Sequence, residues 1–569
     1  MSRRLLVLPL TLAALVAGPA VAGAATFAPA SGAALQTALA TAGTNNQDDV
    51  ITLAGASTLS RAGGFSYGPA GSDTDNTLTI NGTGRTITGT GATTTVLDIF
   101  NGGTGRVTVR DLVVNGVAAT TTVLRAHATT TLDKVSIGGT IAVGNTNGLL
   151  IGGDVTATNL AVAVAAQQGV QADGGTSTIR TSTIRGATVR MVNVSTATLT
   201  VEDSTIRDPA GAGGTGLDGG SPTADITVRR TRFTNLGTAV LAEFGSQVTV
   251  TDSLITGTKN GGTAVSVGDS NNSALFKSRA TIERTTIVGT GEATQVAVAV
   301  DGGSATEQDE MQAIVRDSVI SGFKVALFCK ESNVQSINTI RVERSVLPPG
   351  STDSDACKDF LLPGVVLVSG VTRVDPQFVN PAADDYRPAA GSPLIDASLD
   401  AAGLPGLPTT DFAGSARLVD GNGDCAAKLD IGALEFQAPV APGCAPAGGA
   451  PAPGGTTGKD TLAPVLSALK VTRAIRRSTA KKPPVSMRFK LSEAATVRLT
   501  FARAKGKRYI PLKGALTLKL KAGGQRVRFA GRVSKALRLK AGGYRVTLTA
   551  TDAAGNRSKA ARALFLLSG

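Results

Sequence analysis

The sequence contains no tryptophan, only four tyrosines and a single histidine among its 569 residues. Because aromatic rings offer the large flat surface on which sugars stack, this scarcity disfavours a stacking glycan site and leaves a polar one open. The histidine, His127, lies in Arg125-Ala126-His127-Ala128 and belongs to no catalytic motif. We interpret it as a surface residue rather than a general acid or base.

Cysteine is scarce as well, and none of the four cysteines forms a Cys-x-x-Cys pair. This spacing disfavours zinc binding and redox chemistry. In an exported chain, four cysteines favour two disulfides. We expect Cys329 to pair with Cys357 and Cys425 with Cys444, although four cysteines allow three pairings.

Long apolar runs are absent after the N-terminus, so no membrane span is expected. Residues 1–25 combine two early arginines, an apolar run and a stretch of small residues, which is typical of a secretory signal peptide. We therefore expect a secreted protein that is extracellular or associated with the cell surface.

Acidic residues are nearly missing from one end of the chain. Residues 460–569 hold 26 Lys and Arg against 3 Asp and Glu, whereas the rest of the chain holds 30 against 39. Such a basic segment attracts anionic wall polymer or acidic polysaccharide, and it attracts nucleic acid only without specificity. The sequence gives no indication of the oligomeric state.

The sequence does contain a short motif that recurs every 22 to 33 residues, which indicates a solenoid. The strong copies begin at Val109, Leu132, Val201, Val228, Val250, Ile282, Val315 and Val342. In each copy two apolar residues lie five apart, as Val201 and Ile206 do. Since side chains alternate along a strand, both can face one core only if a corner separates them. This pattern predicts an all-β fold, a parallel β-helix.

The corner position carries alternating charge along the solenoid. In successive strong coils it is occupied by Asp203, Arg230, Asp252, Arg284, Asp317 and Arg344. With coils about 4.8 Å apart, opposite charges on neighbouring coils would pair and fix the register. The next position is always Ser or Thr in these coils, which suits a stack of hydroxyls.

The chain divides into five predicted segments. They are the signal peptide at 1–25, a β-helix with an N-terminal cap at 26–349, a C-terminal cap at 350–437, a Pro/Gly/Ala-rich linker at 438–459 and a basic antiparallel β-sandwich at 460–569. Ser31 is expected to cap a short helix that covers the first coil.

These repeats resemble the right-handed parallel β-helix proteins of the pectin lyase-like superfamily. Five pieces in order resemble the module of choice-of-anchor Q surface proteins: 375–378, 385–387, 391–397, 417–420 and 430–436. Thr549–Asn556 and Asp460–Pro464 resemble bacterial immunoglobulin-like domains. The resemblance implies an extracellular rod, often linked to glycans, and supplies no catalytic set.

The chain contains few residues suited to catalysis on polysaccharides. A polysaccharide lyase needs carboxylates and a basic residue that removes a proton, and Asp203, Arg230 and Asp252 are the residues to test for such a role. A hydrolase needs two carboxylates held across the sugar bond, and adjacent aspartates occur only at 48–49 and 384–385. The charge ladder already accounts for the first set, so we expect no catalytic site.

Calcium has one candidate loop. Asp420, Asn422 and Asp424 have the alternating spacing of a calcium loop, but Cys425 stands where the loop needs glycine and Ile431 where it needs an acid. The alternative is a plain glycine-rich turn.

The sequence thus favours a secreted, non-catalytic β-helix scaffold or adhesin. Its basic C-terminal domain would attach it to anionic glycan or wall polymer at a bacterial surface. The alternative is a polysaccharide lyase or glycoside hydrolase that acts on acidic polysaccharide.

Overall fold

The structure, a computed structural model, describes residues 24–438 and 464–567 with gaps, the longest at 270–276, 303–309, 358–363, 399–408 and 476–484. The expected signal peptide and linker lie almost entirely outside the described residues. The chain forms two compact units, Met1–Ala450 and Pro451–Gly569. Among the described residues no helix is long and apolar enough to cross a membrane.

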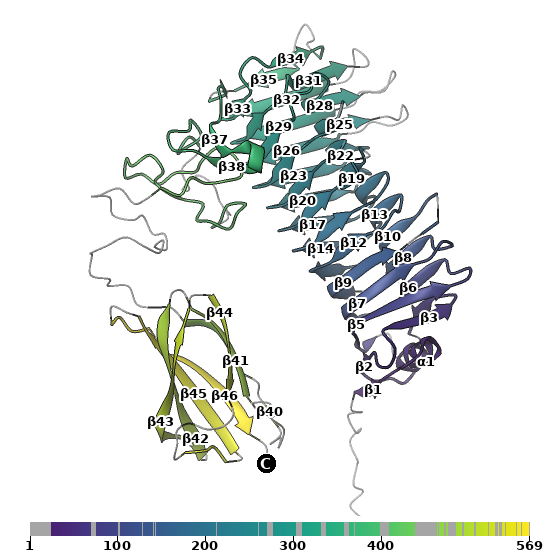
Figure 1. Cartoon of the computed structure of the whole chain (residues 1–569), viewed down its shortest axis with the longest axis vertical. Coiled ribbons are helices and arrows are strands. Elements are labelled where there is room, and N and C mark those ends of the chain that lie inside the picture. Colours follow the sequence, from purple (N-terminus) through teal and green to yellow (C-terminus); the bar gives the residue numbers. More distant parts are fainter. Residues whose placement is uncertain are drawn as a thin grey trace, which may run out of the picture. The chain divides into compact units, whose positions relative to one another are not determined.

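The first unit is the predicted parallel β-helix of about 12 turns (Figure 1). A typical coil contains β17 (Thr198–Glu202), β18 (Thr205–Arg207) and β19 (Thr215–Gly220), and each strand pairs in parallel with its counterpart in the next coil. Two strands of each coil join a 24-stranded sheet, the first sheet, and the third joins a 12-stranded sheet, the second sheet.

The strands of the first sheet are β1 (Ala25–Phe27), β2 (Asp49–Thr52), β3 (Thr58–Ala62), β5 (Leu78–Thr90), β7 (Arg106–Gly116), β9 (Thr129–Gly139), β11 (Val155–Thr158), β12 (Ala161–Ala163), β14 (Thr176–Arg180), β15 (Thr183–Arg185), β17, β18, β20 (Asp225–Arg229), β21 (Arg232–Thr234), β23 (Gln247–Thr251), β24 (Leu254–Thr256), β26 (Arg279–Glu283), β27 (Thr286–Val288), β29 (Glu310–Arg316), β30 (Val319–Ser321), β32 (Ile337–Glu343), β33 (Val346–Leu347), β35 (Val365–Leu367) and β36 (Thr372–Arg373). Those of the second sheet are β4 (Phe65–Tyr67), β6 (Thr95–Ile99), β8 (Thr122–Ala126), β10 (Asn147–Ile151), β13 (Gln168–Ala172), β16 (Arg190–Val194), β19, β22 (Thr238–Glu243), β25 (Thr263–Asp269), β28 (Val296–Gly302), β31 (Val325–Glu331) and β34 (Thr352–Asp355).

One continuous apolar core runs through the solenoid. Val201, Ile206 and Leu217 are fully buried in one coil, and their register partners in the next coils are buried too. At the start, helix α1 (Gly32–Ala42) is present as expected, with Ser31 Oγ accepting a hydrogen bond from Ala34 N. Leu35 and Leu39 of this helix pack into the core, which covers the open end of the stack.

The solenoid does not end at residue 349, where the sequence placed its boundary. Strands β34, β35 and β36 continue the two sheets as far as Arg373. The expected disulfide between Cys329 and Cys357 is present and links this last coil to β31. The sequence pattern missed this coil because its corner, between β35 and β36, has Gly370 (φ 82°) in place of a charged residue and Val371 in place of a hydroxyl residue.

Residues 374–438, which we call the lateral module, cover a flank of the solenoid, whereas the sequence predicted an end cap. The module contains β37 (Phe378–Asn380), the 3-10 helix η2 (Pro381–Ala383) and β38 (Asp385–Pro388), and is otherwise irregular. Leu394 and Ile431 pack against Val319 and Val346 of the solenoid, and Leu434 packs against Leu254. In Figure 1 the module lies beside the later coils.

The second unit is a small β-sandwich of mostly antiparallel strands, as predicted. One sheet contains β39 (Leu466–Val471), β41 (Val485–Leu491) and β44 (Gly523–Phe529); the other contains β40 (Ala474–Ile475), β46 (Ala561–Leu567), β45 (Gly542–Thr551), β42 (Ala495–Lys505) and β43 (Arg508–Leu520). Side chains such as Val497, Leu499, Val546 and Leu548 form its core. The likeness to immunoglobulin domains stays a prediction.

Candidate functional site

The predicted corners are present, and the charged residues of the corner position form them. Asp203, Arg230 and Asp252 have φ of 50°, 43° and 49°, in the left-handed region that turns the chain between two strands. The following hydroxyls satisfy the corner backbone: Ser253 Oγ accepts from Thr231 N at 3.1 Å and donates to Thr251 O at 2.7 Å. The hydroxyl stack therefore replaces ladder hydrogen bonds that the corner interrupts.

The charge ladder consists of separate pairs. Each arginine of the column binds the aspartate of the preceding coil with Nε–Oδ1 distances of 2.6 Å for Arg230–Asp203, 3.0 Å for Arg284–Asp252 and 3.1 Å for Arg344–Asp317. Only the Arg230–Asp203 pair has an exposed carboxylate, and such exposed pairs contribute about 0–1 kcal/mol. The main effect of the three pairs is to fix which coil lies on which.

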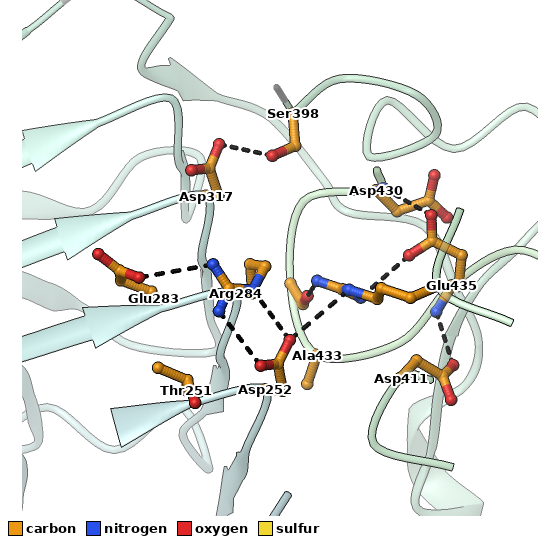
Figure 2. A network of polar contacts seen from close by, with 12 residues as sticks. Thr251, Asp252, Glu283, Arg284, Asp317, Ser398, Asp411, Asp430, Ala433 and Glu435 are labelled. Atoms are coloured by element: carbon orange, nitrogen blue, oxygen red, sulfur yellow. Dashed lines mark hydrogen bonds and ion pairs between the residues drawn. The ribbon is translucent and has the colours of Figure 1, made fainter. Parts of the chain in front are cut away.

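The lateral module covers and buries the middle pair, Arg284–Asp252 (Figure 2). Arg417 of the module is fully buried, with its Nε 3.6 Å from Asp252 Oδ1 and its Nη1 3.0 Å from Glu435 Oε2. It also donates to Gly432 O at 2.7 Å. Asp252 therefore lies between two arginines, Arg284 of the solenoid and Arg417 of the lateral module.

Further polar contacts hold the module to the same corner. Ser398 Oγ donates to Asp317 Oδ1 at 2.7 Å, and Ala433 N donates to Thr286 Oγ1 at 3.0 Å. Arg232 pairs with Asp384 at 3.1 Å. The corner column is thus the docking surface for the module over these coils.

The three residues proposed for catalysis are divided by this arrangement. Asp203 and Arg230 pair with one another on the solenoid corner, whereas Asp252 lies beneath Arg417 with 2% of its surface exposed. A polysaccharide that contacts Asp252 would have to displace Arg417. The catalytic role of the set stays a prediction.

Two buried acids of the module, Asp430 and Glu435, have raised pKa values. Burial raises the pKa of Asp430 to about 6, although its carboxylate accepts hydrogen bonds from Phe436 N and Asp396 N. Burial also holds the pKa of Glu435 well above its ordinary value, against the opposing charge of Arg417. The module therefore contains acids whose ionisation opposes folding.

The raised pKa of Asp430 predicts that stability falls as pH rises. Between the ordinary value of 3.8 and about 6, the folded chain binds more protons at Asp430 than the unfolded chain does. The stabilisation is complete below this window and is lost as pH rises through it. Urea unfolding across the window should show a negative slope that becomes shallower in Asp430→Asn. An unchanged slope in that variant would assign the dependence to other groups.

The candidate calcium loop directs its carboxylates to its own backbone. Asp420 accepts from Gly423 N at 2.8 Å and from Cys425 N at 2.9 Å, and Asp424 accepts from Ala426 N at 2.8 Å. Within the described ranges no cluster of three metal-ligating side chains was found. Calcium binding by Asp420, Asn422 and Asp424 stays a prediction. Cys425 is disulfide-bonded, and its expected partner, Cys444, lies outside the described residues.

The second sheet carries a polar cluster that sequence reasoning missed. Arg190 on β16 binds the carboxylate of Asp218 on β19, and its Nη2 lies 4.0 Å from Glu243 Oε1 on β22. Asp218 is fully buried, and burial raises its pKa, while Arg190 acts in the opposite direction. The only signal in the sequence was an aspartate within the Gly-rich strand Thr215–Gly220.

The sandwich presents a face of threonines and cations, which we call the threonine–arginine face. It comprises Thr496, Arg498, Thr500, Thr517, Lys519, Arg545, Thr547, Thr549, Thr551 and Arg562, all exposed or half-buried on β42, β43, β45 and β46. Threonines separate the cations: Arg498 lies opposite Thr517 and Thr549, and Lys519 lies opposite Thr496. Because like charges do not face one another directly, the face holds several cations with little mutual repulsion.

Comparison with known proteins supports the fold. The family model described as "Right handed beta helix region" matches residues 99–276 and 168–341. No curated protein matches the chain. The enzymatically active domain of bacteriophage CBA120 tailspike protein 2 is similar at 10% identity, with 96% of this chain and 76% of that chain covered and a TM-score of 0.27.

Full-length tailspike protein 2 from an Escherichia coli O157:H7 bacteriophage is similar at 9% identity, with coverage of 96% and 68% and a TM-score of 0.27. At these identities and scores neither tailspike informs the activity of this chain. The match to this family model over residues 99–341 agrees with the parallel register of the coils in the structure.

Proposed function

We propose that this protein is a secreted, non-catalytic β-helix scaffold that is held on an anionic glycan or wall polymer of the bacterial surface by its basic C-terminal domain. The threonine–arginine face is the observation that carries this proposal. It combines four cations with six hydroxyl groups on one sheet, and none of its ten residues is acidic.

The physical basis is electrostatic attraction with hydroxyl contacts added. Adjacent strands lie about 4.8 Å apart, so the cations and threonines form a grid that a linear polyanion can follow. Cations near an anionic surface contribute about 1 kcal/mol each. Threonine hydroxyls both donate and accept hydrogen bonds, which suits phosphate, carboxylate and sugar groups alike.

The competing function is a polysaccharide lyase or hydrolase. Its candidate residues Asp203, Arg230 and Asp252 already serve the corner, where each has an ion-pair partner. Asp252 is also needed to neutralise Arg417. We therefore favour a structural role for these three residues over catalytic turnover.

Removing the basic domain tests the proposed attachment. A chain that ends at residue 459 should stay in the supernatant when mixed with bacterial cell envelopes at low salt, whereas the full chain should sediment with them. Circular dichroism would verify that the shortened chain keeps its β-helix. Sedimentation of the shortened chain to the same extent would refute attachment through this domain.

A further inference from the structure

The cluster of Arg190, Asp218 and Glu243 lies on the outer face of the second sheet. Leu217 and Gly219 are in register with Val192 and Val194 of the preceding coil, and all four are buried in the core or beside it. Because side chains alternate along a strand, Asp218 between them points away from the core. Strands β16, β19 and β22 are consecutive in this sheet, and Figure 1 shows β19 beside β22.

The carboxylate of Asp218 is not required by the fold. Its column continues with Leu241 and Ser266 in the next two coils, so an apolar or hydroxyl side chain fits this position. Asp218 nevertheless has no exposed surface, and within the described chain its Oδ1 has no hydrogen-bond partner. A buried carboxylate oxygen without a partner is costly, and it is ordinarily satisfied by something that binds there.

Groups suited to sugar hydroxyls surround this carboxylate. Along the same column lie two amides, since Asn193 Nδ2 donates to Gln171 Oε1, and Gln171 Nε2 donates to Ser195 Oγ at 2.8 Å. The side chain of Arg190 is 31% exposed, so its remaining N–H groups can reach a ligand. Half-buried Leu150 and Leu241 stand at the two ends of the column and offer apolar surface to C–H groups.

The charge of the cluster decides the class of sugar. Asp173, Asp218 and Glu243 outnumber Arg190 by three to one, and Asp173 accepts from Gln171 Nε2 at the edge of the column. This excess of negative charge disfavours a uronate or a phosphate and suits hydroxyl donors. One of two neighbouring sugar hydroxyl groups can accept a hydrogen bond from Arg190 while the other donates one to Asp218 Oδ1. This geometry requires a small rotation of the Arg190 side chain.

We infer that the column from Leu150 to Leu241 on the second sheet is a binding site for a neutral oligosaccharide, with Arg190 and Asp218 as its central contacts. This binding site is separate from the polyanion-binding site proposed on the threonine–arginine face. Either site can exist without the other. It adds a recognition function to the solenoid itself.

The test is a glycan array that carries neutral and uronate-containing oligosaccharides, followed by calorimetry with the best neutral hexasaccharide. The full chain should bind neutral glycans, and Arg190→Met and Asp218→Asn should each weaken binding at least tenfold. The matched control is Asp301→Asn, which alters an ion pair with Lys330 on the same sheet and should leave affinity unchanged.

Thermal unfolding separates binding from structure. Since Asp218→Asn removes a desolvated charge, its Tm should be unchanged or higher while affinity is lost. Absence of neutral-glycan binding by the wild type, preference for uronates, or equal affinity in Asp218→Asn would each overturn the inference. A lower Tm with unchanged affinity would make Asp218 a structural residue.

Discussion

Replacing Arg417 with methionine is expected to lower the free energy of unfolding of the lateral module by about 3–5 kcal/mol, because the change leaves Glu435 and Asp252 buried with less opposing charge. Arg417 has no exposed surface, so water cannot screen this loss. The variant should show a lower Tm and faster proteolytic release of residues 374–438.

An exposed arginine of the same module supplies the control. Arg387 pairs with Asp385 at the surface, and Arg387→Met should change stability by less than about 1 kcal/mol. The loss in Arg417→Met should also be smaller at pH 5 than at pH 7.5, because Glu435 then takes up a proton more readily. Equal effects of the two substitutions would contradict the buried network of Figure 2.

Changing Arg498, Lys519 and Arg562 to glutamine is expected to weaken binding to a polyanion about 100-fold at low salt. Three cations at about 1 kcal/mol each give about 3 kcal/mol, and every 1.4 kcal/mol is a factor of ten. Affinity for heparin and for polygalacturonate, measured by calorimetry over a salt series, checks the value and should show a shallower salt dependence in the variant.

The comparison variant carries the same charge change away from this face. Arg488 on β41, Arg526 on β44 and Arg538 are exposed on other parts of the sandwich, and changing all three to glutamine should weaken binding far less. If both triple variants lost affinity equally, net charge alone would account for the attachment. The threonine–arginine face would then have no particular role.

Sequence reasoning reached the solenoid because its signal is repeated many times. The spacing of Val201 and Ile206 predicted the corner, and the alternating charges predicted pairs such as Arg230–Asp203. Each repeat adds an independent observation, so errors in one coil do not matter.

The docking of the lateral module on the flank of the solenoid escaped prediction for the opposite reason. Arg417 meets Asp252 across 165 positions of sequence, and neither residue carries a mark of that contact. Asp218 was missed because a single aspartate in a strand looks like any exposed polar residue, and only its burial distinguishes it. Contacts made once in the chain, between distant segments, leave no pattern to read.

The central claim, binding without turnover, is tested most directly by incubating the full chain with a panel of acidic and neutral polysaccharides, with and without calcium. We expect the protein to bind polymer while the polymer's chain length, its reducing ends and its content of unsaturated uronates stay unchanged. Reproducible shortening of any polysaccharide, abolished by Asp252→Ala, would contradict the account and make the corner column a catalytic site.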